Sequence, residues 1–314
     1  MSDFLEDVWT GLNTSPKYLQ SKYFYDETGD EIFREIMACE EYYLTRCEMD
    51  IFSGQANTVS ERILSRFREF DLVELGPGDC SKTIHLLRAL MEKKADFNYC
   101  PVDISDHVIM ELTKNLPTAL PGIQVKGLIG DYFKMLGALQ DISARPKVVL
   151  FLGSNIGNVP IDQNAGFFKL LRSHLAPGDL ILTGFDLVKD PETILAAYND
   201  TGGVTRRFNL NLLRRMNTAL DANFDLDEFE HSPVYDKESG ACKSYLVSKK
   251  QQVVTFSGRG DVRFEQGERI FMEISQKYTV DMTDEIASVA GFTPLEHFLD
   301  QNKWFLDALW QAEA

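Results

Sequence analysis

The sequence lacks a long apolar segment, and it lacks an excess of basic residues. None of its apolar runs approaches the roughly 20 residues that a helix needs to cross a bilayer, so we expect no membrane span. The 314 residues include 32 Lys and Arg against 48 Asp and Glu, a net charge of −16. Nucleic acids and anionic lipid surfaces are bound by clustered basic side chains, so this balance argues against both partners.

Cysteine and histidine are few and scattered. The five cysteines form no CxxC pair, which is typical of reduced thiols in a cytoplasmic protein. The five histidines show no HExxH or comparable spacing, so we predict no metal site. Residues 1–7 are acidic and do not resemble a signal peptide, which also favours the cytoplasm.

A regular alternation of strands and helices begins at Asp71. The apolar run 71–75 predicts a buried strand, Gly76-Pro77-Gly78 predicts a turn, and apolar residues at 84, 87 and 91 predict an amphipathic helix. Further strands are expected over 97–103, 123–129, 147–153 and 179–185, with helices over 106–115 and 163–175. This spacing predicts an α/β fold with a doubly wound, Rossmann-like parallel sheet.

The pattern changes after Asp186. Helices are expected at about 192–199 and 204–220, followed by strand-like segments at 234–235, 242–249, 252–257 and 269–280. These segments predict a second, α+β region built on antiparallel strands. A helix over 282–290 and a hairpin of 292–299 with 303–310 are expected to close the first sheet.

Polar residues follow four of the predicted parallel strands. Ligands of doubly wound sheets lie beyond the carboxyl ends of the strands, so these residues form a candidate site. They are Gly76-Pro77-Gly78, Asp103, Gly130-Asp131-Tyr132-Phe133 and Gly153-Ser154-Asn155-Ile156-Gly157-Asn158. Glycine and successive acids favour S-adenosylmethionine over a dinucleotide, because the acids would repel a pyrophosphate. A nicotinamide-dependent oxidoreductase is disfavoured, since the full glycine fingerprint is missing.

Longer motifs give a more specific indication. They are Tyr23-Phe24-Tyr25-Asp26, Glu41-Tyr42-Tyr43-Leu44-Thr45-Arg46, Val73-Glu74-Leu75-Gly76-Pro77-Gly78-Asp79, Pro101-Val102-Asp103-Ile104-Ser105, Phe151-Leu152-Gly153-Ser154, Ile156-Gly157-Asn158, and residues 186–191, 197–200 and 208–213. In these motifs, over about residues 20–310, the chain resembles the histidine-specific Nα-methyltransferases of ergothioneine biosynthesis.

The resemblance implies an enzyme that trimethylates L-histidine with S-adenosylmethionine as co-substrate and without a metal. It implies a methyltransferase domain of residues 51–188 and 278–314 and a substrate-binding domain of residues 1–50 and 189–277. Its cofactor-binding residues would be Gly76, Lys82, Asp103, Asp131 and Tyr132. Tyr25, Asn158 and Tyr198 would hold the amino acid's α-amine and carboxylate, with Tyr25 and Asn158 as the catalytic pair, and Tyr42, Glu273 and Ser275 would read the imidazole.

The substrate residues can also be judged from their spacing. Glu273 and Ser275 are two apart, so on a strand they face the same side and can bond the two nitrogens of one ring. The chain departs from the family at Cys80, Asn155, Phe185, Ser244, Phe271 and Met272. Ser244 stands where the family has a methionine beside the imidazole. Another acceptor such as tryptophan, or a non-catalytic cofactor-binding relative, therefore stays open. So does the oligomeric state, with a monomer as one expectation.

Overall fold

The computed structural model describes residues 2–314, with side chains from residue 4 onward; Met1 lies outside the described residues. The chain divides into two compact units. Unit 1 comprises residues 2–43 and 189–276, and unit 2 comprises residues 44–188 and 277–314. Each unit has a sheet and a hydrophobic core of its own.

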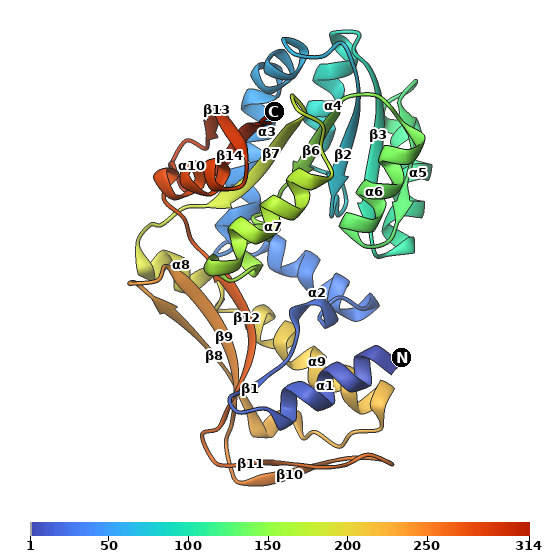
Figure 1. Cartoon of the computed structure of the whole chain (residues 1–314). Helices are drawn as coiled ribbons and strands as arrows, with labels where there is room; N and C mark the ends of the chain where they lie inside the picture. The colour runs from blue at the N-terminus through green and yellow to red at the C-terminus, as the bar shows by residue number, and fades with distance from the viewer. Residues whose placement is uncertain (1) are drawn as a thin grey trace. The chain divides into compact units, whose positions relative to one another are not determined.

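Unit 2 is built on an eight-stranded sheet with the order β13-β14-β7-β6-β2-β3-β4, and β5 also pairs with β3 (Figure 1). Its strands are β2 (Glu69–Leu75), β3 (Asp96–Asp103), β4 (Gln124–Val125), β5 (Leu128–Ile129), β6 (Lys147–Phe151), β7 (Leu180–Asp186), β13 (Phe292–Leu299) and β14 (Phe305–Ala312). β2 to β7 run parallel, and β13 and β14 add an antiparallel hairpin beside β7. The predicted fold class and the closing hairpin are confirmed.

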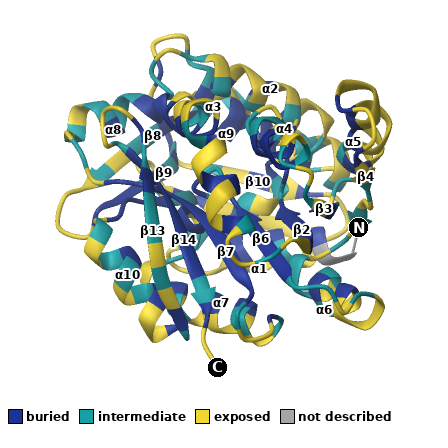
Figure 2. Ribbon diagram, turned by 90° about the horizontal axis from the view of Figure 1, so that it is seen from above, coloured by how far each residue is buried: buried dark blue, intermediate teal, exposed yellow. Residues whose placement is uncertain are grey.

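Helices cover this sheet. They are α3 (Tyr43–Leu64), α4 (Thr83–Glu92), α5 (Asp106–Ala119), α6 (Tyr132–Ile142), α7 (Ile161–Ser173) and α10 (Val280–Val289), with a 3-10 turn η2 (Asn155–Asn158). Leu136 of α6 and Phe168 of α7 belong to the same buried cluster as Val149 of β6. Figure 2 shows β6 and β7 in the buried colour, as expected for parallel strands covered by helices.

Unit 1 combines helices with a four-stranded sheet of order β1-β12-β9-β8 and a separate β10–β11 hairpin. Its strands are β1 (Lys17–Tyr18), β8 (Phe229–Asp236), β9 (Ala241–Ser248), β10 (Gln252–Phe256), β11 (Gly260–Phe264) and β12 (Arg269–Gln276). Its helices are α1 (Ser2–Asn13), α2 (Glu27–Ala38), α8 (Pro191–Ala197) and α9 (Val204–Leu220), with 3-10 turns η1 (Ser21–Tyr23) and η3 (Leu226–Glu228). Leu212 and Met216 of α9 share a buried cluster with Leu246 of β9.

The structure corrects several sequence expectations. The single strand expected over 123–129 is two short strands, β4 and β5. The break falls opposite Cys100 and Pro101 of β3, and Pro101 has no backbone N–H to donate. β12 ends at Gln276 rather than at residue 280. α1, β1 and β11 were not predicted, and β1 runs parallel to β12, so this sheet is not wholly antiparallel.

The boundary between the units also differs from the expected one. Residues 50 and 51 lie inside α3, and all of that helix beyond Tyr43 belongs to unit 2. Within unit 2, the Gln55 Nε2 donates to the Leu299 carbonyl at 2.8 Å. Such bonds tie α3 to the sheet of unit 2. Which ligand each unit binds stays a prediction.

Two negative observations apply to residues 2–314. No helix there is both long and apolar enough to cross a bilayer. No three of its His, Cys, Asp or Glu side chains are grouped so that they could hold a metal ion.

Candidate active site

The turn after β2 gives a ligand close access to the backbone. Gly76 has φ +71° and Gly78 has φ +54°, left-handed values that glycine adopts without steric cost. A Cβ built at Gly76 would lie 2.7 Å from the Tyr132 hydroxyl. Gly76 and Tyr132, two of the predicted cofactor residues, are therefore neighbours in unit 2.

The two predicted acids follow neighbouring strands and also stabilise their own turns. Asp103 ends β3 and accepts from the Ser105 N–H at 2.9 Å. Asp131 caps α6 by accepting from the N–H groups of Phe133 (3.1 Å) and Lys134 (3.2 Å). The Gly130 N–H donates to the Asp103 carbonyl at 2.9 Å, which joins the two strand ends. Each acid keeps carboxylate lone pairs for a ligand beyond these local bonds.

Burial raises the pKa values of two residues at this end of the sheet, Asp103 and Tyr132. It raises the pKa of Asp103, although the N–H groups of Ser105 and Ile104 lower it in part. Burial also raises the pKa of the Tyr132 hydroxyl, and the negative charges of Asp103 and Asp131 raise it further. Tyr132 is thus a neutral hydrogen-bonding group at neutral pH.

Lys82 is not a solvated first-turn lysine. It stands at the start of α4, its side chain is 20% exposed, and it forms an ion pair with the Glu48 carboxylate of α3. Burial alone would lower the pKa of Lys82, but the Glu48 carboxylate outweighs this, and the net pKa is raised. Lys82 therefore carries a fixed positive charge close to the glycine turn.

Asn158 is the exposed last residue of η2, in the same unit as the predicted cofactor residues. Hydrogen bonds of the Tyr278 side chain hold the turn that carries Asn158. The Tyr278 hydroxyl donates to the Ile156 carbonyl at 3.2 Å and accepts from the Asn164 amide at 2.7 Å. Asn158 thus sits on a supported turn rather than on a loose loop.

In unit 1 the structure joins four of the five remaining predicted residues through one continuous line of contacts. The Tyr25 ring lies 5.6 Å from Phe33, Phe33 lies 6.3 Å from Tyr42, and Tyr42 lies 6.4 Å from Tyr198, each distance between ring centroids. The Tyr198 hydroxyl then donates to the Ser275 hydroxyl at 2.6 Å. The sequence did not single out Phe33 as a member of this line, although it lies in the same aromatic segment.

Local caps lie next to two tyrosines of this line, Tyr25 and Tyr198. Asp26, next to Tyr25, caps α2 by accepting from the Gly29 N–H at 2.8 Å, and it accepts from Asn211 of α9 at 3.0 Å. Asp200, two residues after Tyr198, accepts from the Val204 and Thr205 N–H groups, both at 2.7 Å. Both tyrosines are thereby fixed next to helix termini.

The fifth residue, Glu273, lies beside Ser275 on β12. The register of β12 against β9 shifts between Phe271 and Glu273, and it then runs regularly from Glu273 to Gln276. Glu273 and Ser275 are therefore on one face of the strand, directly opposite Ser244 and Cys242 of β9. The Ser244 hydroxyl is buried and has no hydrogen-bond partner among the residues that the structure describes.

The structure shows what surrounds Cys80 and Phe185, two positions at which the sequence is expected to depart from the family. Cys80, where the family has glycine, adopts φ +60° and is buried with its sulfur 3.5 Å from the Tyr99 hydroxyl. A glycine would adopt this left-handed backbone without steric cost. Phe185 is fully buried and packs on Tyr278 and Trp310, with ring centroids 5.0 and 5.5 Å away. Phe185 is therefore part of the core.

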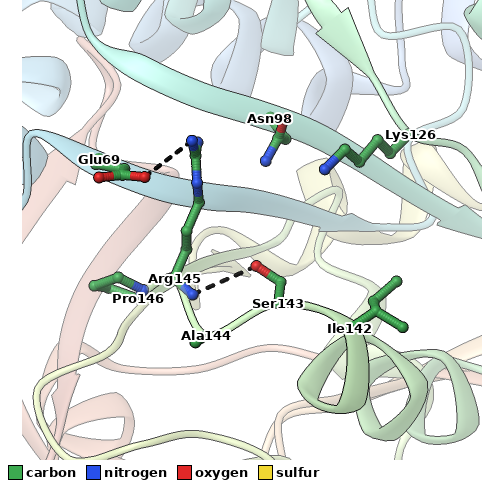
Figure 3. Close-up of a pocket in the computed structure, with 8 residues that line it drawn as sticks. All are labelled: Glu69, Asn98, Lys126, Ile142, Ser143, Ala144, Arg145 and Pro146. Carbon is green, nitrogen blue, oxygen red and sulfur yellow. Dashed lines mark hydrogen bonds and ion pairs between the residues drawn. The ribbon is translucent and has the colours of Figure 1, made fainter.

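An open depression of about 550 Å³ lies elsewhere in unit 2, near the amino ends of β2 and β6 (Figure 3). It is lined by Glu69, Asn98, Lys126, Ile142, Ser143, Ala144, Arg145 and Pro146. None of the predicted site residues lines it. It is at the opposite end of these strands from the glycine turn.

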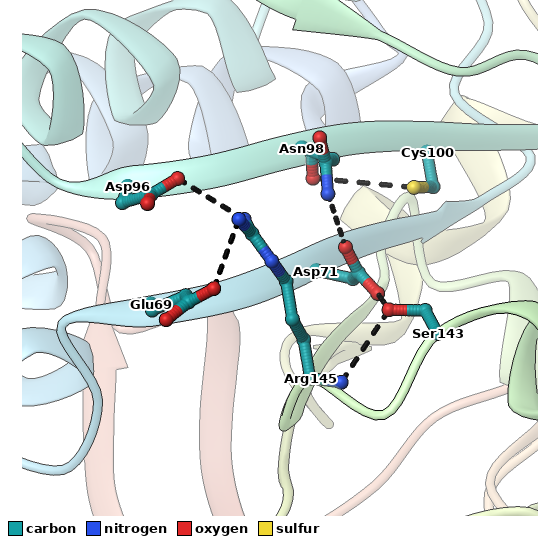
Figure 4. A network of polar contacts seen from close by, with 7 residues as sticks. All are labelled: Glu69, Asp71, Asp96, Asn98, Cys100, Ser143 and Arg145. Carbon is teal, nitrogen blue, oxygen red and sulfur yellow. Dashed lines mark hydrogen bonds and ion pairs between the residues drawn. The ribbon is translucent and has the colours of Figure 1, made fainter.

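Most polar groups of that depression bond one another or two neighbouring acids, Asp71 and Asp96 (Figure 4). Arg145 pairs with Glu69 at 2.9 Å and with Asp96 at 3.1 Å. The Asn98 amide and the Ser143 hydroxyl both donate to Asp71. These bonds fasten the start of β6 to β2 and β3, which is a structural role.

Comparison with known proteins agrees with the motifs. Residues 4–312 match the family model described as "Histidine-specific methyltransferase, SAM-dependent". The chain belongs to this family. It is 35% identical over 302 residues to a histidine N-alpha-methyltransferase of Mycolicibacterium smegmatis, covering 96% of this chain and 90% of that protein. It is 33% identical to the histidine N-alpha-methyltransferase of Mycobacterium tuberculosis, covering 94% and 90%.

A fungal relative is longer than this chain and is similar to it over only part of its own length. The ergothioneine biosynthesis protein 1 of Schizosaccharomyces pombe is 31% identical over 268 residues, which cover 82% of this chain and 34% of that protein. As a member of the family, this protein is an S-adenosylmethionine-dependent methyltransferase, as predicted from the strand ends and the motifs. The roles of individual residues stay predictions.

Proposed function

We propose that this methyltransferase transfers three methyl groups from S-adenosylmethionine to the α-nitrogen of L-histidine, giving the trimethyl betaine used in ergothioneine biosynthesis. The family match over residues 4–312 supports the reaction. The observation that best supports a histidine acceptor is the polar edge of β12, where Glu273 lies two residues from the Tyr198–Ser275 hydrogen bond. A carboxylate and a hydroxyl on one strand face suit the two nitrogens of an imidazole.

The cofactor would be held by unit 2. Gly76 admits the ligand to the backbone, and Asp103 accepts from the ribose hydroxyls. Asp131 and Tyr132 lie beside the adenine. Lys82, with its fixed charge, faces the carboxylate of the methionine part. These assignments are supported by the chemistry of each group and by the location of Gly76, Asp103 and Asp131 just after parallel strands.

The amino acid would be held by Tyr25, Tyr42, Tyr198, Glu273, Ser275 and Asn158. The α-amine must be neutral to attack, because its lone pair forms the new N–C bond while the S–C bond of the sulfonium breaks. Hydroxyl and amide oxygens of Tyr25 and Asn158 can accept from the amine and orient this lone pair. Each transfer leaves S-adenosylhomocysteine, and conversion of the ammonium to the trimethylated product releases three protons.

We also propose that the enzyme acts in the cytoplasm, on a free amino acid and without a metal. The five cysteines are all free thiols in the structure, which suits a reducing compartment. Activity that is unchanged after dialysis against a chelator would support the absence of a metal. Activity that is lost on dialysis and restored by a divalent cation would contradict it.

The proposal is tested with purified protein, S-adenosylmethionine and a panel of amino acids, with products followed by mass. Trimethylhistidine as the main product would support it. Turnover of tryptophan without turnover of histidine would contradict the acceptor and retain the enzyme class. Binding of S-adenosylhomocysteine without transfer to any amine would indicate a non-catalytic relative.

A further inference from the structure

Lys82 belongs to a cluster of buried ionisable groups that the proposed function does not yet explain. Glu48 of α3 is 1% exposed, and Asp307 of β14 is fully buried. Three carboxyl groups, those of Glu48, Asp307 and Glu74, lie near the single ammonium of Lys82. Buried charges are costly unless they are paired, so this cluster needs an explanation.

Glu48 bonds two loops at once. Its Oε2 accepts from the Lys82 ammonium, in the segment that leads from β2 into α4. Its Oε1 accepts from the Gly153 N–H at 2.7 Å, at the turn after β6. These are the loops that carry the predicted cofactor residues Gly76 and Lys82 and the predicted substrate residue Asn158. One carboxylate therefore sets the spacing between two loops of the proposed site.

The fold leaves room for this carboxylate at Gly184. Gly184 of β7 is directly opposite Asp307 of β14. A Cβ at Gly184 would lie 2.5 Å from Glu48 Oε1 and 3.2 Å from Asp307 Oδ1. Because Gly184 has no side chain, the carboxyl groups of Glu48 and Asp307 can both occupy this space.

The hydrogen bonding of Asp307 indicates where its proton goes. As an ionised acceptor, Asp307 would have no donor at either oxygen among the described residues. As a neutral acid, it can donate its hydroxyl to Glu48, with which it shares the space at Gly184. Burial, and then the negative charge of Glu48, raise the pKa of Asp307, whereas Lys82 lowers it in part. Glu74, the other acid near Lys82, has a pKa raised to about 7 by burial.

We propose that Glu48 is a positioning residue of the cofactor site, which holds the Lys82 ammonium and the Gly153 turn together, and that Asp307 supports it by donating its carboxyl proton to Glu48. Glu48 then accepts three hydrogen bonds, from Lys82, Gly153 and Asp307, which is within the capacity of a carboxylate. Lys82 has three N–H donors and gives one to Glu48, so two remain for an anionic group. This inference rests on the proposed binding of the cofactor by Lys82.

The test measures the affinity for S-adenosylhomocysteine by calorimetry in Lys82→Met, Glu48→Gln and the double variant. Loss of a charge-assisted bond should weaken binding by about tenfold or more in each single variant. Because Glu48 acts through Lys82, the double variant should bind no more weakly than the weaker single variant.

A matched control and a rescue separate positioning from stability. Glu61→Gln makes the same change on the same helix, in an exposed pair with Lys93 at 3.0 Å, and should leave the affinity unchanged. Asp307→Leu removes the proton donor and should weaken the binding of S-adenosylhomocysteine. Asp307→Asn keeps an N–H that can donate to Glu48 and should bind with an affinity close to that of the wild type. If Glu48→Gln does not fold, Gly184→Ala displaces the same carboxylate without changing the charge and should weaken binding.

The outcomes are distinguishable. Wild-type affinity in Lys82→Met would show that Lys82 does not bind the cofactor, and it would overturn this inference. The proposal that histidine is the acceptor would not be affected. Weak binding in Lys82→Met together with wild-type affinity in Glu48→Gln would overturn the positioning role alone. Additive losses in the double variant, or no rescue by Asp307→Asn, would also overturn it.

Discussion

The Tyr198 hydroxyl donates a 2.6 Å hydrogen bond to the Ser275 hydroxyl, which joins the end of α8 to the edge strand segment that carries Glu273. The bond is buried, because Tyr198 is 7% and Ser275 6% exposed. The bond therefore fixes the Ser275 hydroxyl relative to the end of α8.

Tyr198→Phe should raise the KM for histidine and leave the KM for S-adenosylmethionine unchanged. Loss of one neutral hydrogen bond is worth about 0.5–1.5 kcal/mol, or roughly two- to tenfold in KM. Tyr23→Phe is the control, since its hydroxyl bonds Asp7 at 2.7 Å in the same unit and is not assigned to the substrate. Steady-state kinetics that show equal effects of the two variants would count against a substrate role for Tyr198.

Glu273→Ala should raise the KM for histidine far more than the KM for S-adenosylmethionine. A buried imidazole N–H that loses its acceptor costs about 1–3 kcal/mol. Glu268→Ala is the matched control, because Glu268 pairs with Lys17 at 2.5 Å immediately before the same strand. Equal changes in both KM values for Glu273→Ala would exclude its proposed role.

Ser244→Ala should have opposite effects on stability and on affinity. The Ser244 hydroxyl is buried without a partner among the described residues, directly opposite Glu273. Its removal should leave the ligand-free protein as stable as before or more stable by about 1 kcal/mol, since an unsatisfied hydroxyl is costly to bury. If the hydroxyl bonds the acceptor, the same change raises the KM for histidine. A lower melting temperature with an unchanged KM would show that Ser244 matters only for packing.

His231 should make stability depend on pH in the weakly acidic range. Burial lowers the pKa of His231 to about 4, with Asp200 opposing the shift in part. The unfolded chain, with a histidine pKa near 6.5, binds more protons than the folded chain between these values, so stability falls as the pH falls from about 6.5 to about 4. The loss should reach about 2–3 kcal/mol near pH 4. In His231→Gln, the free energy of unfolding, measured with denaturant, should no longer fall by this amount between about pH 6.5 and pH 4. The same pH dependence in the variant and the wild type would show that His231 does not cause the loss of stability.

The sequence predicted most of what is regular in this chain. The strand–turn–helix repeat placed β2, β3, β6 and β7 because each is a short apolar run followed by a glycine or an acid. It missed β1, which has only two residues, and β11, which begins at a glycine. It placed the boundary of the units at residues 50 and 51, inside α3, because it predicted no helix there.

The functional roles of the candidate site residues stay predictions, but the structure shows which of these residues are neighbours. Four residues of the line, Tyr25, Tyr42, Tyr198 and Ser275, had been indicated by the resemblance, whereas Phe33 had not. Glu48 and Asp307 were missed, although each left a signal. Glu48 stands two residues after the Tyr42–Arg46 motif, and Asp307 is an isolated acid in an otherwise apolar strand. Their pairing could not be foreseen, because it depends on the space at Gly184, which only the register of β7 against β14 reveals.

The central claim is that L-histidine is the acceptor. The most direct measurement is the mass of the product formed from L-histidine and an excess of S-adenosylmethionine, with L-tryptophan in a parallel reaction. We predict that histidine gains three methyl groups, with three equivalents of S-adenosylhomocysteine formed, and that tryptophan is unchanged. Unmodified histidine beside methylated tryptophan would contradict the account.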